Sequence, residues 1–400
     1  MGVLTARAPT SLRVAFLTHS YPRFSGDAAG SFLLTLAQAL VAHDVLVDVL
    51  APAAQGLAAH EVLDGIPVHR FRYAPRSWET LAYTGTMAET VSASLIGKAA
   101  LAGYIYAQAR ATRALVQQLR IDIVHAHWWF PAGLAATTRA RRGRPLVVTM
   151  HGSDVRLATR KTWAHPLLRH VLRRAASATT VSTWLAEQAR RMAPESQPIV
   201  APMPVNTALF EPGPRDLRAA GELLFVGRIN EQKGLRLLLD ALARARGPVR
   251  LHIVGDGPDV NPLHEYAATL GIAQRLTWHG ALPRAQLVPL YQRASAVVVP
   301  SVDEGLGLVA VEAQLCETPV IAFASAGLLD VITHGDSGVL VPAKDVAALA
   351  ATIDAVVADS GLRRSLGIAG RRQALARFSP DAVAAGYATL YRRVTSHAAS

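Results

Sequence analysis

The sequence predicts an α/β fold built from two Rossmann-like, doubly wound domains, and three observations support this. The chain has 400 residues, which exceeds what one hydrophobic core usually supports. Short apolar runs rich in Val, Ile and Leu alternate with helix-like segments throughout, as in parallel sheets covered by helices on both faces. Residues 201–214 are dense in proline, which breaks helices and central strands, so they predict a linker.

Each half of the chain contains six strand candidates. Those of the first half are residues 13–18, 45–50, 66–71, 121–125, 146–150 and 178–181. Those of the second half are residues 223–226, 249–254, 276–278, 296–299, 320–323 and 339–341, with helical segments in every gap. The segment from Trp78 to Leu119 is helical in pattern, and two interpretations stay open for it: a packed helical insertion, or an excursion that faces a membrane or an acceptor.

Composition narrows the class of protein. Hydrophobic residues make up 51% of the chain and charged residues 18%, which excludes disorder, and no apolar run approaches the roughly 20 residues that span a bilayer. The apolar stretch Val14 to Thr18 is too short for a signal-peptide core. The single cysteine, Cys316, cannot form an internal disulfide. We therefore expect a soluble, cytoplasmic protein.

Positive charge is concentrated in the first half. Residues 1–205 carry 22 Lys and Arg against 11 Asp and Glu, whereas the remainder carries 19 against 18. This asymmetry indicates an anionic partner, such as phospholipid headgroups, a polyanionic acceptor or nucleic acid. Only four of the 41 basic residues are lysines, so genomic base composition is an alternative cause of the arginine excess.

Residues 227–234 (GRINEQKG) follow a predicted strand and precede the helix that begins near Leu235. Ligands of doubly wound proteins bind at the carboxyl ends of parallel strands, and two cations there, Arg228 and Lys233, can converge on one diphosphate. Gly227 and Gly234 let the backbone approach such a group closely. Solvated surface charges are the alternative. The glycine turn around Gly255 is a weaker signal of the same kind.

Residues 300–308 (PSVDEGLGL) are the most informative segment, because a strand exit with two glycines opens a helix there. Unpaired N–H groups and the positive end of the helix dipole favour phosphate oxygens. Glu304 lies at the helix entrance and Glu312 about two turns inside it. These carboxylates can accept hydrogen bonds, Glu304 from a sugar ring and Glu312 from a ribose. The alternative is a capping acid and a solvent-facing helix acid.

The sequence resembles the retaining GT-B glycosyltransferases of family four. Glu304 and Glu312 match the family's glutamates separated by seven residues, and Arg228 and Lys233 match its diphosphate-binding pair. Further agreement runs through residues 255–258, 279–280, 319–322 and 335–342 in the second half, and 21–23, 26–27, 30–32, 125–129 and 151–154 in the first. Two departures are Leu306, where an aromatic residue is commoner, and residues 204–206 (PVN) in the linker.

The resemblance implies two domains that face a cleft: residues 1–203 bind the acceptor and residues 204–380 the nucleotide-sugar. Residues 381–400 then form a helix that crosses back to the N-terminal domain. The implied catalytic residues are His151, Arg228, Lys233 and Glu304. The implied substrate-binding residues are Gly30, Asp154, Gly227, Gly255, Gly305, Leu306, Gly307, Leu308 and Glu312.

His151 ends a predicted strand, so it should point toward the transferred sugar, and the resemblance implies that it holds the sugar and stabilises its reactive centre. A histidine satisfied by backbone is the alternative. His125 and His127 share one face of a strand and could ligate a metal, but no third ligand is evident. The chain contains no Asp-x-Asp sequence, which commonly holds a metal-bound diphosphate, so we expect catalysis without a metal or cofactor.

The resemblance further implies a UDP- or GDP-sugar donor and retention of anomeric configuration. The acceptor would be a sugar, polysaccharide, lipid-linked or phospholipid hydroxyl, with the enzyme peripheral on the inner face of the membrane. The rival among enzymes is a nucleotide-sugar epimerase or hydrolase on the same fold. The rival outside enzymes is a protein that binds nucleic acid or another anionic surface; we expect no nucleic-acid partner.

Overall fold

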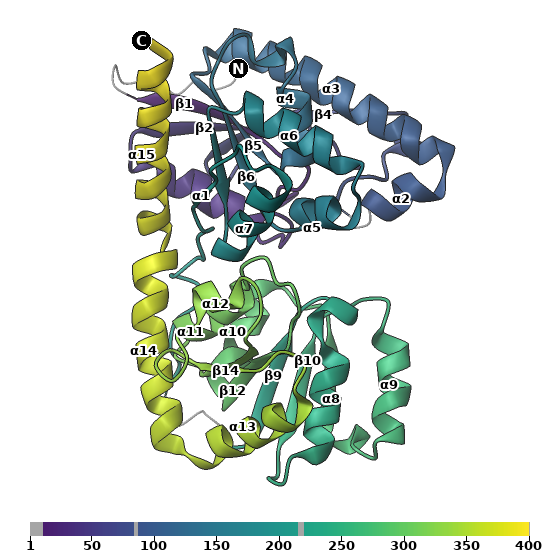
Figure 1. The fold of residues 1–400 in the computed structure, drawn as a ribbon, viewed down its shortest axis with the longest axis vertical. Coiled ribbons are helices and arrows are strands. Elements are labelled where there is room, and N and C mark those ends of the chain that lie inside the picture. The colour runs from purple at the N-terminus through teal and green to yellow at the C-terminus, as the bar shows by residue number, and fades with distance from the viewer. Residues whose placement is uncertain (1–10, 84–86, 215–219, 400) are drawn as a thin grey trace. The chain divides into compact units, whose positions relative to one another are not determined.

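The computed structural model describes residues 11–83, 87–214 and 220–399 and divides the chain into two compact units. The first consists of Met1–Pro204 with Pro380–Ser400, and the second of Val205–Ser379. Each unit contains one largely parallel sheet covered by helices, so the predicted fold class is confirmed (Figure 1). Among the described helices, none is long and apolar enough to cross a membrane.

The first unit contains eight strands in the order β3-β4-β2-β1-β5-β6-β7-β8. Only β3 runs antiparallel to its neighbour. Their bounds are Leu12–Leu17 (β1), Val45–Pro52 (β2), His60–Leu63 (β3), Ile66–Phe71 (β4), Ile123–His127 (β5), Leu146–Met150 (β6), Ser177–Thr180 (β7) and Ile199–Val200 (β8). The sequence did not predict β3 and β8. Both lie at the edges of the sheet, where little apolar side chain is buried and the pattern is correspondingly weak.

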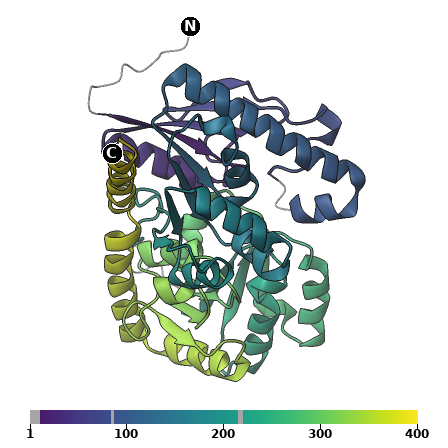
Figure 2. The ribbon, with the colours of Figure 1, turned by 45° about the horizontal axis from the view of Figure 1, so that its top comes forward.

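Helices cover both faces of this sheet. They are α1 (Ser31–Val41), α2 (Met87–Ala93), α3 (Leu95–Leu119), α4 (Leu134–Ala136), α5 (Ser153–Arg160), α6 (Ala164–Arg174), α7 (Thr183–Met192) and α15 (Pro380–Ala399). The helix α15 packs against α1, so the C-terminal residues belong to the N-terminal unit (Figures 1 and 2).

The helix α3 resolves the two interpretations of the segment before β5. It is a packed crossover between β4 and β5, because its inner face, with Tyr104 and Val116, is buried. Its outer face is nonetheless unusual, since Leu95, Ile96 and Tyr106 are exposed. The interpretation as a packed helical insertion is therefore correct for the inner face of α3 only.

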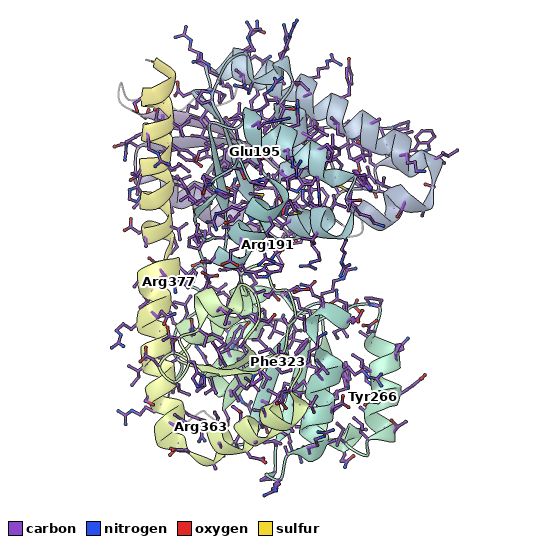
Figure 3. All side chains as sticks on the ribbon, viewed as in Figure 1. Arg191, Glu195, Tyr266, Phe323, Arg363 and Arg377 are labelled. Carbon is purple, nitrogen blue, oxygen red and sulfur yellow. The ribbon has the colours of Figure 1, made fainter. Side chains whose placement is uncertain are left out.

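The second unit contains six parallel strands in the order β11-β10-β9-β12-β13-β14. Their bounds are Glu222–Val226 (β9), Arg250–Val254 (β10), Leu276–Gly280 (β11), Ala296–Val299 (β12), Val320–Phe323 (β13) and Val339–Val341 (β14). All six were predicted from the sequence. The buried side chains of Phe225, Ile253 and Phe323 pack into one core with the apolar faces of the covering helices (Figure 3).

Seven helices of the second unit are α8 (Leu235–Arg244), α9 (Val260–Thr269), α10 (Arg284–Arg293), α11 (Leu308–Leu315), α12 (Leu328–Val331), α13 (Val346–Ala358) and α14 (Ser360–Phe378). The strand β9 lies between β10 and β12. After β9 the chain continues to β10 and β11 on one side of the sheet, and after β12 it continues to β13 and β14 on the other side. Such a switch point opens a crevice at the carboxyl ends of the strands, which is where doubly wound folds bind ligands.

Candidate active site

The loops that follow β9 and β12 are joined at this switch point. The backbone N–H of Val302 donates to the carbonyl of Gln232 over 2.9 Å, and the Gln232 side chain donates to the carbonyl of Asp303 over 3.2 Å. The Lys233 ammonium lies 2.6 Å from a carboxylate oxygen of Glu304. The two loops therefore bring a cation and an anion together at the carboxyl edge of the sheet.

The pair of Lys233 and Glu304 keeps the capacity to bind a ligand. The two side chains are 22% and 15% exposed, so their attraction is screened less than that of a surface pair. An ammonium has three N–H donors and a carboxylate about four lone-pair sites, and this contact uses only one of each. Ammonium donors suit phosphate oxygens, and carboxylate acceptors suit hydroxyl groups.

Glycine allows three strand exits to lie side by side. The N–H of Gly227 donates to the carbonyl of Val254 over 3.0 Å, and the N–H of Gly255 donates to the carbonyl of Gly280 over 2.8 Å. A Cβ atom at position 255 would lie 1.8 Å from the carbonyl oxygen of Gly227, so only glycine fits. Arg228 projects from this layer with an exposed side chain.

The helix α11 begins next to the ion pair. Its N-cap is Gly307, which has a φ of 93°, and a Cβ atom there would lie 2.6 Å from the Leu328 side chain. The positive φ therefore favours glycine, and a larger residue would also require the Leu328 side chain to shift. The first-turn N–H groups of a helix have no partners within the helix and carry its positive dipole end. Leu306 is buried with 5% exposure, so its side chain packs inside the unit.

Glu312 lies inside the second unit with only 3% of its surface exposed, so it is not a solvent-facing helix acid. The Tyr291 hydroxyl donates to Oε2 over 2.8 Å, and the Arg284 guanidinium donates to Oε1. Burial, followed by the charge of Glu312, holds the pKa of Tyr291 well above its usual range. Tyr291 therefore stays protonated and remains a donor, which fixes the carboxylate from two sides.

In the first unit, Asp154 organises the loop after β6. One carboxylate oxygen accepts from the backbone N–H groups of His151, Gly152 and Val155 at 3.0–3.1 Å, and the other accepts from the N–H of Trp129 at 3.0 Å. Burial raises the pKa of Asp154 to about 6, while these four hydrogen bonds act in the opposite direction. The side chain is 4% exposed, so its task in the structure is to shape the loop that carries His151.

The ring of His151 is held on several sides. Its centroid lies 4.4 Å from the Trp128 ring and 5.3 Å from the Phe32 ring, and its Nε2 lies 3.1 Å from Nδ1 of His127. Burial holds the pKa of His151 well below its usual range, so the ring is neutral at pH 7. Gly30 is the N-cap of α1, two residues before Phe32, which places it beside this cluster.

The alternative of a metal bound by His125 and His127 finds no support in the described structure. His125 uses Nε2 with the Thr149 hydroxyl and Nδ1 with the Tyr391 hydroxyl, each at 2.7 Å. No group of three His, Cys, Asp or Glu side chains suited to a metal occurs among the described residues.

Comparisons with known proteins agree with this geometry. Residues 28–203 match the model of the glycosyl transferase 4-like domain, and residues 220–373 match that of glycosyl transferases group 1. The D-inositol 3-phosphate glycosyltransferase of Xylanimonas cellulosilytica is 30% identical, covering 96% of this chain and 97% of that protein. The chain belongs to the group 1 glycosyltransferases. The same-named protein of Geodermatophilus obscurus is 35% identical, over 64% of this chain and 63% of its own length.

Solved structures place the glycosyltransferase in the GT-B fold. Sucrose-phosphate synthase from Thermosynechococcus elongatus matches with a TM-score of 0.81 and 23% identity, covering 96% of this chain and all of that one. Anabaena HepE in complex with UDP-glucose matches with a TM-score of 0.71 and 20% identity, with the same coverage of both chains. At these identities the likeness concerns the fold.

The residues predicted from the sequence fall into two groups in this glycosyltransferase. In the second unit, one layer of strand exits contains Gly227, Arg228, Lys233, Gly255, Glu304, Gly305, Leu306 and Gly307, and the helix α11 that follows contains Leu308 and Glu312. In the first unit, His151 and Asp154 are directly connected and Gly30 lies nearby.

Four neighbours of these residues were not assigned from the sequence. Arg284 and Tyr291 hold Glu312, while His127 and Trp128 hold the ring of His151. Arg284 and Tyr291 are seven residues apart and so share a face of α10. This spacing is the local sequence pattern that could have indicated that both contact one partner. His127 and Trp128 were visible as part of a motif, but the pattern did not show what they contact.

We expect Asp154→Asn to lower the free energy of unfolding by about 3 kcal/mol at pH 7.5, because an amide NH₂ would oppose backbone N–H donors in a buried place. Urea denaturation followed by circular dichroism measures this change. Asp381→Asn is the control, since Asp381 is 84% exposed, and it should change stability by less than about 0.5 kcal/mol. Equal stability of the two variants would contradict the role assigned to Asp154.

Proposed function

We propose that this glycosyltransferase moves a sugar from a nucleotide-sugar donor to an acceptor hydroxyl, with retention of configuration and without a metal ion. The observation that carries the proposal is the ion pair between Lys233 and Glu304 beside the first turn of α11. This arrangement presents donors for a diphosphate next to an acceptor for sugar hydroxyls, at the edge of the sheet where doubly wound folds bind nucleotides.

Each site residue takes one role in this proposal. Lys233, Arg228 and the backbone N–H groups at the start of α11 neutralise the departing diphosphate. Glu304 accepts a hydrogen bond from the transferred sugar, and Glu312 accepts one from the ribose. The backbone at Gly227, Gly255 and residues 305–308 approaches the phosphates, with Leu306 contributing its main chain because its side chain is buried. Asp154 shapes the loop that presents His151.

The reaction breaks the bond between the anomeric carbon and the diphosphate oxygen and forms one from that carbon to the acceptor oxygen. The breaking bond lengthens toward an oxocarbenium-like state, and the acceptor attacks from the face that the diphosphate leaves. The acceptor proton passes to the departing phosphate. His151 holds the sugar near its reactive centre. Both matching family models describe transferases, so we propose transfer rather than epimerisation or hydrolysis.

We propose UDP or GDP as the donor nucleotide and favour UDP. Support comes from HepE, which shares the fold and was solved with UDP-glucose. The related D-inositol 3-phosphate glycosyltransferases support a hydroxyl of a small polar molecule as the acceptor. A phosphorylated or lipid-linked acceptor would also explain the positive charge of the first half of the chain.

A thermal-shift panel of UDP, GDP, ADP and their sugars tests the donor assignment. We expect UDP or GDP to raise the melting temperature, since a ligand at 100 times its Kd stabilises by about 2.7 kcal/mol. The shift should persist in EDTA and should disappear in Lys233→Met. Lys344→Met, a change of an exposed lysine in the same unit, should retain it. Stabilisation that requires Mg²⁺, or that survives Lys233→Met, would overturn the proposal.

We further propose that the enzyme binds anionic membranes through the outer face of α3, which comprises Leu95, Ile96, Lys98, Tyr106, Arg110 and Arg113. The exposed fractions of Leu95, Ile96 and Tyr106 are 81%, 51% and 71%. Helix α3 contains no acidic residue. Exposed apolar side chains beside cations, without acids, are typical of helices that lie in a membrane interface.

The neighbouring turn extends the positive charge of this face. The short 3-10 helix Arg139–Arg141 packs against α3, and the Arg142 guanidinium donates to the Gln117 side chain over 3.4 Å. Arg139 and Arg142 are exposed. The apolar end of the outer face of α3 therefore continues into a cationic end, which suits acyl chains and anionic headgroups together.

Sedimentation with vesicles tests this surface. Wild type should sediment with phosphatidylglycerol-containing vesicles and much less with pure phosphatidylcholine. Changing Leu95, Ile96 and Tyr106 to Ser should release most of the bound protein. The matched control changes Ile368 and Leu375 on α14, which are 42% and 37% exposed, and should bind like wild type. The proposal would be wrong if the protein showed no preference for anionic vesicles, or if the control variant lost as much vesicle binding as the α3 variant. Binding to heparin without binding to vesicles would also contradict it.

A further inference from the structure

His127 lies at the end of β5, between two other histidines, and is completely buried. Its ring centroid lies 4.5 Å from the Phe16 ring and 4.1 Å from the His125 ring. Its Nδ1 lies 3.1 Å from Nε2 of His151, on the loop after β6. Within the described part of the chain, Nε2 of His127 is buried and has no hydrogen-bond partner.

The contact between these two nitrogens allows only two arrangements of protons in neutral rings. In the first, Nδ1–H of His127 donates to Nε2 of His151, so the proton of His151 is on Nδ1. In the second, Nε2–H of His151 donates to Nδ1 of His127, so the proton of His127 is on Nε2. The direction of the hydrogen bond between His127 and His151 therefore fixes which nitrogen of His151 is protonated.

The unpartnered nitrogen of His127 decides between the two arrangements. In the first, Nε2 carries a lone pair, and in the second it carries an N–H group. A buried N–H without an acceptor is rarer in folded proteins than a buried acceptor without a donor. The first arrangement is therefore the more stable one, and it leaves His151 with an N–H at Nδ1.

Among the described residues, the titratable neighbours of the two rings supply no charge that would reverse this choice. The titratable side chains that face His151 and His127 are His19 and His125. Burial lowers the pKa of His19 to about 4 and that of His125 to about 3, so both are neutral at pH 7. The carboxylate of Asp154 is directed at backbone N–H groups of the loop.

We propose that His127 is a positioning residue that holds His151 in the Nδ1–H tautomer, so that His151 offers a hydrogen-bond donor to the sugar. The inference rests on the proposed function of His151. Trp128 and Phe32 keep the His151 ring in place, while His127 engages Nε2 and leaves Nδ1 as the nitrogen available to a ligand. Such a ring cannot accept a proton from the acceptor at Nδ1, which agrees with proton transfer to the departing phosphate.

Two-bond ¹H–¹⁵N correlation spectra of the full-length protein labelled with ¹⁵N-histidine read the tautomers directly. Spectra of His151→Asn and His127→Asn assign the two rings. We expect the Nδ1–H pattern for both residues at pH 7.5. The Nε2–H pattern for His151, or a doubly protonated ring, would overturn the inference.

Kinetics of matched variants tests the consequence. An asparagine amide can replace the Nδ1–H donor, so His127→Asn should keep most of kcat, whereas His127→Leu should lower kcat about tenfold with little change in the donor KM. Tyr391→Phe is the control, because it removes the hydroxyl that lies 2.7 Å from Nδ1 of His125 and leaves the rings of His125, His127 and His151 in place. It should lower the melting temperature and leave kcat unchanged.

The outcomes separate this inference from the proposed function. Full kcat in His127→Leu, together with a large loss in His151→Ala, would overturn the positioning role while the function stands. Full kcat in His151→Ala would show that the proposed role of His151 is wrong, and the donor role inferred here would then fall with it. Equal losses of kcat in His127→Asn, His127→Leu and Tyr391→Phe would reduce His127 to a packing role.

Discussion

The ion pair between Lys233 and Glu304 is the constraint on which the rest of the second unit depends. The two residues are 71 positions apart, and their side chains meet because β9 and β12 are adjacent parallel strands that end at the same edge. A carboxylate here prevents the ammonium from lying uncompensated in a partly buried place. The ammonium in turn orients the carboxylate. In the proposed function, diphosphate binding and sugar binding are therefore parts of one arrangement rather than two separate features.

The first unit uses a carboxylate differently. Asp154 has no ion-pair partner among the described residues, and backbone N–H groups from two loops take up both of its oxygens. The result is a fixed loop on which a neutral histidine lies between aromatic rings. Glu304 thus balances the charge of a neighbouring ammonium, whereas Asp154 holds the backbone of its loop in place. The sequence alone does not distinguish these tasks, since both acids follow a strand and lie at or just before the start of a helix.

The sequence was sufficient for the fold because the central strands are buried on both faces and read as continuous apolar runs. It failed at β3, where His60 and Val62 are exposed and no residue is buried, so that the strand leaves little apolar signal. At the candidate site, Glu304 could be predicted because it belongs to a local glycine motif. The burial of Glu312 against Tyr291 and the contact of His127 with His151 are tertiary facts, which depend on how separate elements pack and leave no local pattern.

Calorimetric titration of UDP and of uridine into wild type, Lys233→Met, Glu304→Gln and the double variant tests the central claim most directly. If the ammonium recognises the diphosphate, Lys233→Met should raise the Kd for UDP at least tenfold and leave the Kd for uridine unchanged. The effects of Lys233→Met and Glu304→Gln on the binding free energy of a UDP-sugar should not be additive. Wild-type affinity for UDP in Lys233→Met, or equal weakening of UDP and uridine, would contradict the account.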